Sequence, residues 1–359
     1  MTNEMPDIIV RKEVKKISNP DPNVNDVICL IGGFETDENY LTPKFYETLE
    51  AAEADYYDGS ESTLPEANKA LREVFDDETI SGVLVVNVSV KSGTSPNYSW
   101  ARTVTKTKLE NSLAALAQLE FNILNVAEEL TDELITVIDT DAKARFKAKN
   151  AYGWIGAGTR ANATAYATTA GKLGDFCYAF LTQPLGVRGE SLSLLESGAW
   201  LTNYIARLPV ANSLTSKVLG EVTSIGTEYT FGDEDLGKTL VGLGFFVVRL
   251  INPKENTYEC VNSAGANGLD LYINRTRDYI VNDFALREYL GEHNDDATID
   301  SVKMECNRLL TKFRDMKAVE NINYSVEKVD SKTAKVILNS IEFSDILLHI
   351  KVFMTIEVV

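Results

Sequence analysis

The chain ends in the stretch Ser344 to Val359, SDILLHIKVFMTIEVV, in which every even-numbered position from Ile346 to Val358 is apolar. These positions are Ile346, Leu348, Ile350, Val352, Met354, Ile356 and Val358. A period of two residues predicts a β-strand. At ~3.3 Å per residue it would reach roughly 40 Å, about twice the length of a strand of ~5–6 residues. We therefore expect residues 344–359 to form a C-terminal arm that extends beyond the sheet in which it starts.

The opposite end of the chain has a shorter run of the same kind. Ile8, Val10 and Val14 share one face, and Asn19-Pro20-Asp21-Pro22 then ends the run, because proline lacks an N–H and restricts the residue before it. Residues 1–22 are predicted to be an N-terminal arm. A long apolar edge pairs readily with other chains, and proteins often use one for β-strand addition to a neighbour. The alternative is that each run is simply the last strand of its own domain.

Length, charge and cysteine content restrict the class of protein. With 359 residues the chain has room for two or three domains. Its 35 basic and 53 acidic residues give a net charge of −18, which argues against nucleic acid or an anionic membrane as the main partner. The four cysteines form no CxxC pair, so we expect buried thiols in a reducing compartment. Without a signal peptide or a membrane-length apolar stretch, the chain is expected to stay soluble in the cytoplasm.

Basic residues are nevertheless concentrated in two places. Residues 11–16 of the N-terminal arm carry four of them beside a single acid. The second cluster comprises Lys303, Arg308, Lys312, Arg314 and Lys317. In an acidic protein such clusters suit an acidic partner surface, although a run of charges is more often a solvated face.

Strands and helices alternate through the middle of the chain. Apolar runs predict strands at 27–31, 83–90, 121–126, 151–157 and 176–181. Helical spacing predicts helices at 43–56, 64–75, 109–119, 131–149, 160–170 and 190–207, and the region at 92–99 is expected to be a loop or an inserted hairpin. Residues 134–138 also fit a strand, but the helical spacing of apolar residues there favours a helix. The alternation predicts a mixed α/β fold with a central parallel or mixed sheet and helices on both faces.

The C-terminal part is predicted to be α+β, with two helices and an antiparallel sheet. A strand at 244–250 is followed by helices at 274–290 and 298–318, and then by strands at 323–329 and 334–343. The predicted division is an N-terminal arm at 1–22, an α/β region at 23–243 with a candidate insertion near 91–108, an α+β domain at 244–343 and the C-terminal arm at 344–359.

A search for catalytic residues finds no convergent set. His293 lies in a polar loop and His349 on the polar-leaning face of the last strand, so neither is placed at an α/β crevice. Asp139 and Asp141 would suit Mg²⁺ only if they ended a strand. The glycine turns at 32–33 and 156–158 complete no phosphate-binding motif. We therefore expect no catalytic residue, no metal and no cofactor, which favours a scaffold.

Two C-terminal stretches resemble the contractile tail sheath proteins of phages, R-type bacteriocins and related contractile injection systems. Gly242 to Arg249, GLGFFVVR, is similar to that family's glycine-rich turn before a strand, although Gly244-Phe245-Phe246 departs from the expected Gly-Ile-Asn type of turn. Asp270 to Ile280, DLYINRTRDYI, is similar to the start of a helix in the family. Weaker similarity lies at 197–207 and in the N-terminal strand with its two glycines. The remaining helix, hairpin and long last strand follow in the family's order.

The resemblance implies a structural subunit that polymerises helically around a rigid inner tube and contracts to drive the tube through a target envelope. The arms would complete sheets in neighbouring subunits, and the 298–318 helix with the second basic cluster is one candidate for facing the tube. The implied partners are other copies of the chain, the tube protein, and baseplate and tail terminator proteins, with no nucleic acid and no direct membrane contact. The implied location is a virion tail or a secreted contractile particle, assembled in the host cytoplasm.

The sequence is also compatible with two other functions. One is a metal- or nucleotide-binding α/β enzyme that uses the loops after Ile31 and Ile138. The other is a different virion-associated structural module, such as a tube or capsid protein. An enzyme should remain discrete in size, whereas a sheath subunit should form helical polymers.

Overall fold

A mixed sheet of six strands forms the centre of the molecule, in the order β2-β3-β1-β6-β7-β8. The computed structural model describes residues 26–59, 63–76, 80–94, 97–159, 173–232, 235–284, 296–328 and 334–344. The strands are β2 (Lys44–Tyr46), β3 (Gly82–Asn87), β1 (Val27–Gly32), β6 (Ile123–Val126), β7 (Gly153–Ala157) and β8 (Cys177–Leu181). Neighbouring strands are parallel except β2, which is antiparallel to β3. Parallel strands are covered on both faces, which explains their nearly continuous apolar sequences. The predicted central sheet is confirmed.

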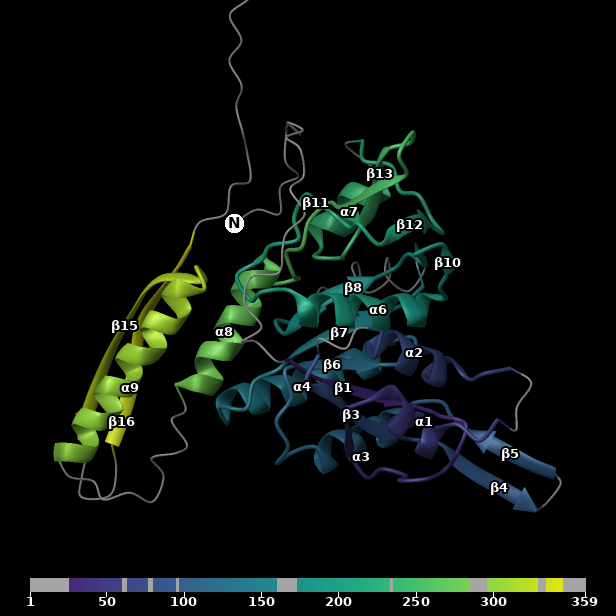
Figure 1. Ribbon diagram of the computed structural model, residues 1–359, viewed down its shortest axis with the longest axis horizontal. Coiled ribbons are helices and arrows are strands. Elements are labelled where there is room, and N and C mark those ends of the chain that lie inside the picture. The colour runs from purple at the N-terminus through teal and green to yellow at the C-terminus, as the bar shows by residue number, and fades with distance from the viewer. Residues whose placement is uncertain are drawn as a thin grey trace, which may run out of the picture.

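Helices cover both faces of this sheet (Figure 1). Ile28 and Leu30 of β1 share a core with α1 (Leu49–Tyr56), α2 (Glu66–Val74) and α6 (Leu194–Arg207). Cys29 and Ile31 share the opposite core with α3 (Lys106–Ala115), α4 (Asp132–Lys147) and α7 (Leu236–Gly242). Successive residues of a strand point to opposite faces, so one strand supplies both cores. We call this sheet and these helices the α/β body.

Smaller antiparallel sheets surround the α/β body. The hairpin of β4 (Val90–Thr94) and β5 (Asn97–Ala101) extends away from it (Figure 1), so the region expected to be a loop or a hairpin is a hairpin. Two three-stranded sheets are formed by β10 (Glu190–Ser191), β9 (Leu185–Val187) and β12 (Val222–Ile225), and by β11 (Lys217–Val218), β14 (Thr257–Cys260) and β13 (Val248–Asn252).

The C-terminal elements follow the predicted order of two helices and a hairpin. They are α8 (Leu271–Asp283), α9 (Asp296–Asp315), β15 (Val319–Lys328) and β16 (Ala334–Phe343). The two strands are antiparallel. Helix α8 lies between the α/β body and α9, and the hairpin lies against α9 at the side of the molecule (Figure 1).

The helix predicted at 43–56 begins later than expected. Residues 44–46 form β2 instead of a first helical turn. Asn39 and Leu41 adopt positive φ of 53° and 51° and turn the chain so that it runs along the edge of β3. Helix α1 starts only at Leu49, where the Thr48 hydroxyl accepts a hydrogen bond from the first turn.

The helix predicted at 190–207 also begins later than expected. Arg188 and Gly189 have positive φ and close a tight turn, so residues 190–191 pair with β9. Helix α6 starts after Ser193, because Ser193 and Glu196 form a reciprocal capping box at that point.

Other expectations are confirmed where the structure describes the residues. The ambiguous region around 134–138 is helix α4, as favoured, and the Thr131 side chain caps its start. All four cysteines are buried and free. The helix predicted at 160–170 falls outside the described residues. Across the described ranges, no helix combines the length and apolar character that a membrane crossing requires.

Candidate functional site

Helix α9 and the hairpin β15–β16 form a C-terminal unit with a small apolar core of its own. Apolar residues recur every three or four positions along α9 and bury one face of the helix. They are Ile299, Val302, Cys306, Leu309 and Phe313. Val319 and Ile322 of β15 complete this core, and the Tyr324 hydroxyl donates to the side chain of Asn307 at 2.8 Å. Helix α9 therefore covers one face of the hairpin.

Within the described ranges, neither outer edge of the hairpin in the C-terminal unit pairs with another strand. Each strand is ten residues long, and among the described residues the two strands pair only with each other. Val336, Leu338 and Ile341 of β16 are only partly buried against the core. A two-stranded hairpin is marginally stable alone, and its edges carry backbone N–H and C=O groups that can pair with further strands. The hairpin is thus suited to accept strands on either side.

Helix α8 connects the C-terminal unit to the α/β body. Leu271 at its start belongs to the core of the body, whereas Ile280 and the following Phe284 belong to the core of the C-terminal unit. Its N-cap residue, Asp270, is buried, and one carboxylate oxygen accepts hydrogen bonds from the hydroxyls of Ser213, Thr215 and Ser263 at 2.8–3.0 Å. These bonds fix the start of α8, because the same carboxylate also accepts from the helix backbone.

A buried ion pair joins α8 to the residue that precedes β1. Arg275 is 0% and Asp26 is 1% exposed, and the guanidinium donates to the Asp26 carboxylate at 2.9 Å. The same guanidinium donates to the carbonyl of Leu208 at 3.0 Å. Burial raises the pKa of Asp26 to about 6, although the positive charge of Arg275 opposes the shift. The desolvation cost of the carboxylate therefore exceeds the attraction within the pair.

A second buried network joins α8 to the central sheet. The Tyr178 hydroxyl, from β8, donates to one oxygen of Asp278 at 2.9 Å, and the Nε of Arg277 donates to the other at 2.8 Å. Arg277 also lies over the ring of Phe176, 4.7 Å from its centroid. Burial raises the pKa of Asp278, and the neighbouring guanidinium opposes that shift. Four charged residues of the DLYINRTRDYI stretch, Asp270, Arg275, Arg277 and Asp278, thus hold α8 in place.

The predicted arm residues lie outside the described part of the chain. This applies to Ile8, Val10, Val14, Ile346, Leu348, Ile350, Val352, Met354, Ile356 and Val358. The structure does describe the residues next to them. Asp26 follows the N-terminal segment, and Ser344 precedes the apolar run of the C-terminal arm.

The basic cluster predicted to face a tube is divided between two sides of α9. Arg314 lies toward β15, where its guanidinium donates to the Glu320 carbonyl, whereas the Lys303 side chain pairs with Asp300 of its own helix at 3.2 Å. Lys312 lies toward α8, where it pairs with Asp283 at 2.8 Å, and Arg308 pairs with Glu305 of its own helix. Lys317 follows the end of α9, with a positive φ of 56°. The cluster is therefore not a single exposed face, and its role in tube contact stays a prediction.

The crevice at which parallel α/β sheets bind ligands is filled by the chain itself. The strand order reverses at β1 and β6, and a ligand would bind beside the carboxyl ends of these strands. The segment after β5 lies there: Arg102 donates to the Phe34 carbonyl and the Val104 N–H donates to the Glu128 carboxylate, both at 2.9 Å. A Cβ at Gly33 would lie 2.2 Å from the carbonyl oxygen of Arg102. Protein therefore occupies the space that a phosphate would need.

We expect Gly33→Ala to lower the free energy of unfolding by ~1–3 kcal/mol, because the added methyl group overpacks this contact. Gly220→Ala is the matched control, since a Cβ at Gly220 meets no atom within 4 Å. Urea denaturation measures both. Equal stability of the two variants would show that the segment after β5 does not fill the crevice.

The enzyme alternative also required a loop after Ile138. These residues are instead part of helix α4. Asp139 pairs with Lys143 at 2.7 Å and Asp141 with Arg145 at 3.0 Å, so each carboxylate is already neutralised by a cation one turn away. Within the described ranges, no group of three or more His, Cys, Asp or Glu side chains is arranged to hold a metal. His293 and His349 both fall outside those ranges.

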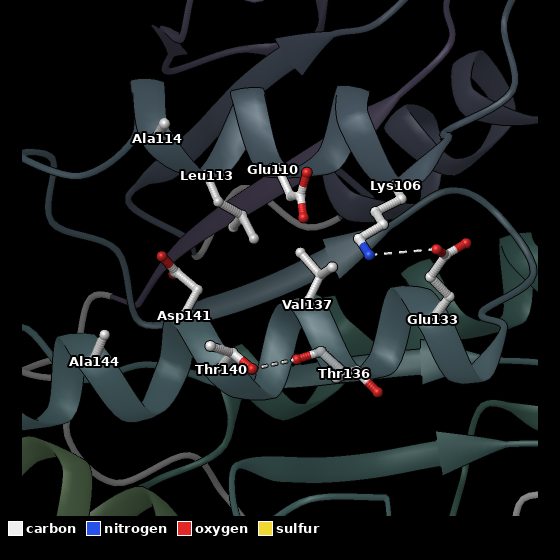
Figure 2. Close-up of a pocket in the computed structure, with 10 residues that line it drawn as sticks. All are labelled: Lys106, Glu110, Leu113, Ala114, Glu133, Thr136, Val137, Thr140, Asp141 and Ala144. Carbon is white, nitrogen blue, oxygen red and sulfur yellow. Dashed lines mark hydrogen bonds and ion pairs between the residues drawn. The ribbon is translucent and has the colours of Figure 1, made fainter.

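A groove of about 610 Å³ runs between α3 and α4 (Figure 2). Leu113 and Val137 contribute apolar side chains to it, and Lys106 and Glu133 pair across it at 3.4 Å. The polar side chains along it come from the exposed sides of two helices, without a nucleophile held by a base. The groove therefore has no arrangement suited to catalysis.

Comparison with known proteins identifies the fold. No family model matches the sequence, and no curated protein does. The sheath tail protein of Desulfitobacterium hafniense superposes with a TM-score of 0.60 at 14% identity, over 91% of this chain and 99% of that chain. The chain has the tail-sheath fold. The sheath tail protein of Listeria innocua gives 0.65 at 13% identity, over 91% and 94%. A chain of the contracted helical sheath of the anti-feeding prophage gives 0.60 at 13% identity, over 99% of each.

The tail-sheath fold gives the stretch DLYINRTRDYI a structural role, since it forms α8 and carries the buried contacts described above. Sequence reasoning did not identify Asp26 or Tyr178 as partners of that helix. One signal was available: an arginine among apolar residues on a buried helix face requires an acid nearby. Which acid it is depends on the tertiary fold.

Proposed function

We propose that this chain is the structural subunit of a contractile sheath. It polymerises helically around a rigid inner tube, and neighbouring subunits are linked by strands of their terminal arms. Contraction of the polymer drives the tube through a target envelope without a catalytic step in this chain. The observation that carries the proposal is the open hairpin β15–β16 in a chain with the tail-sheath fold.

Strand addition explains why the hairpin and the arms occur in one chain. The hairpin has two open edges among the described residues, and the chain has two terminal runs with the period-2 pattern of a strand. A strand donated by another copy satisfies the edge groups of β15 or β16 and covers the partly buried side chains of β16. Repetition makes such links strong, because ~1 kcal/mol per net hydrogen bond adds up over many copies.

The arrangement of hairpin and arms supports other copies of the chain as partners, and the further proposed partners rest on the resemblance to tail sheath proteins. These further partners are the inner tube protein, and baseplate and tail terminator proteins. One chain of similar fold comes from the baseplate structure of the anti-feeding prophage, with a TM-score of 0.66 at 13% identity over 99% of each chain. The net charge of −18 does not suit nucleic acid, and we propose no direct membrane contact. The particle is a virion tail or a secreted contractile particle, assembled in the host cytoplasm.

Deletion of residues 345–359 is expected to abolish polymer formation and to leave a folded, discrete subunit. The reason is that the deletion removes the predicted donor strand but none of the described core. Sedimentation velocity measures the size distribution, and circular dichroism checks the fold.

Two double variants of full length test whether polymerisation depends on the apolar face of the C-terminal arm. Ile350→Asp with Val352→Asp places two acids on the apolar face and is expected to prevent polymerisation. His349→Asp with Lys351→Asp places the same acids on the other face and is expected to permit it. Normal polymers from the deletion variant would exclude the C-terminal arm as a link.

A further inference from the structure

The described residues next to both arms are held by the same helix. Arg275 of α8 donates to the carboxylate of Asp26, which follows the N-terminal segment. The Tyr272 hydroxyl of α8 donates to the carbonyl of Ser344, the first residue of the C-terminal arm. Tyr272 and Arg275 are three residues apart, so they lie on neighbouring positions of one helix face. The bases of two arms that are 318 residues apart in sequence thus meet within one helical turn.

The three residues that provide these side chains are buried, whereas Ser344 is half-buried. Arg275 is fully buried, and Asp26 and Tyr272 are 1% and 2% exposed. The Ser344 N–H also donates to the carbonyl of Ala318 at 3.4 Å, which ties the base of the C-terminal arm to the start of β15. A hydrogen bond in such surroundings does not exchange readily with solvent, so it transmits displacement between the groups that it joins.

We infer that α8 is the mechanical junction between the two arms, and that Tyr272 and Arg275 are the positioning residues that pass tension from one arm to the other. The inference rests on the proposed function in one respect, namely that the arms carry load between copies. Tension then travels from Asp26 through one turn of α8 to Ser344. The backbone also continues from Asp26 into β1 of the central sheet, so the side-chain contacts on α8 form a second path that runs beside the backbone.

The test is a single-molecule pulling experiment on the full chain, with handles attached at its two termini. Tyr272→Phe removes one buried hydroxyl at the base of the C-terminal arm. Tyr178→Phe is the matched control, because it also removes one buried hydroxyl from α8's surroundings, but on the side of the sheet. At constant force, Tyr272→Phe is expected to speed the first rupture event about fivefold, the factor that one net hydrogen bond supplies. Tyr178→Phe is expected to leave that event unchanged.

A second variant tests the other contact. Arg275→Lys keeps the positive charge but loses the planar fork that reaches both Asp26 and the Leu208 carbonyl, so it is also expected to speed the first rupture. Equal acceleration by Tyr178→Phe, or no acceleration by Tyr272→Phe and Arg275→Lys, would overturn the inference. The experiment uses the isolated chain. A wild-type protein that never polymerises would therefore contradict the proposed function without affecting this result.

Discussion

Arg275→Met is expected to lower the free energy of unfolding by ~3–5 kcal/mol at pH 8, because it leaves the buried Asp26 carboxylate without its cation. The loss is expected to shrink as the pH falls. The pKa of Asp26 is already raised to about 6 in the folded chain, and it rises further when the opposing charge of Arg275 is removed. The folded variant therefore takes up a proton that the unfolded chain, with an ordinary carboxyl pKa of ~3.9, does not.

The pH dependence of this stability deficit follows from the difference between the pKa values of Asp26 in the folded and unfolded chain. A raised folded-state pKa means that folding is favoured as the pH falls through that pKa toward the unfolded value. Between pH 8 and pH 5 the deficit should decrease by about 1.4 kcal/mol for each unit by which the substitution raises the pKa of Asp26. Part of the deficit remains, because the carbonyl of Leu208 also loses a donor.

Denaturant titrations at pH 8 and pH 5 measure both deficits. Arg72→Met is the control, since Arg72 and Glu53 form an ion pair with side chains 45% and 28% exposed. An exposed pair contributes at most ~1 kcal/mol, and no comparable rescue by acid is expected there. Equal deficits for Arg275→Met at the two pH values would mean that removal of Arg275 does not raise the pKa of Asp26, which would contradict the electrostatic role of the pair.

Phe313→Ala is expected to unfold the C-terminal unit selectively. Phe313 is 0% exposed in a core of nine buried residues among those described, so its truncation leaves a cavity that costs ~3–5 kcal/mol. That core is small and joins the α/β body mainly through α8. The unit should therefore open while the central sheet stays folded, and the two parts should no longer unfold in one transition.

Cysteine labelling distinguishes the two parts of the molecule. Cys306 is buried in the C-terminal unit, whereas Cys29, Cys177 and Cys260 are buried in the cores of the α/β body. In Phe313→Ala we expect a thiol reagent to modify Cys306 well before the other three, as read by mass spectrometry. Met304→Ala, on the opposite face of α9 and 73% exposed, should label like the wild type. Simultaneous labelling of all four thiols in Phe313→Ala would mean that the unit and the body unfold together.

The sequence predicted those parts of the fold that depend on local pattern. The buried strands of the central sheet, helix α4 and the order helix, helix, hairpin at the C-terminus all follow from apolar periodicity. The starts of α1 and α6 were predicted too early, because positive φ at Asn39 and Arg188 sends the chain into a strand first. Such turns depend on pairing with β3 and β9, which no local pattern reveals.

The candidate site was predicted less completely, because its contacts join distant parts of the chain. Arg275 lies in the stretch DLYINRTRDYI, which the sequence analysis relates to the start of a helix, but its partner Asp26 is 249 positions away. The basic residues of α9 looked like one cluster in the sequence. Their distribution over two sides of the helix depends on Asp283 from α8 and Glu320 from β15.

The proposed sheath function is tested most directly by a helical reconstruction, by electron cryo-microscopy, of polymers formed when the chain is expressed with its tube protein. We predict hollow cylinders in which β15 and β16 form the middle of a larger sheet, with at least one further strand supplied by another copy. Discrete particles alone would contradict the sheath function. Cylinders in which both edges of the hairpin stay unpaired would contradict the proposed exchange of strands.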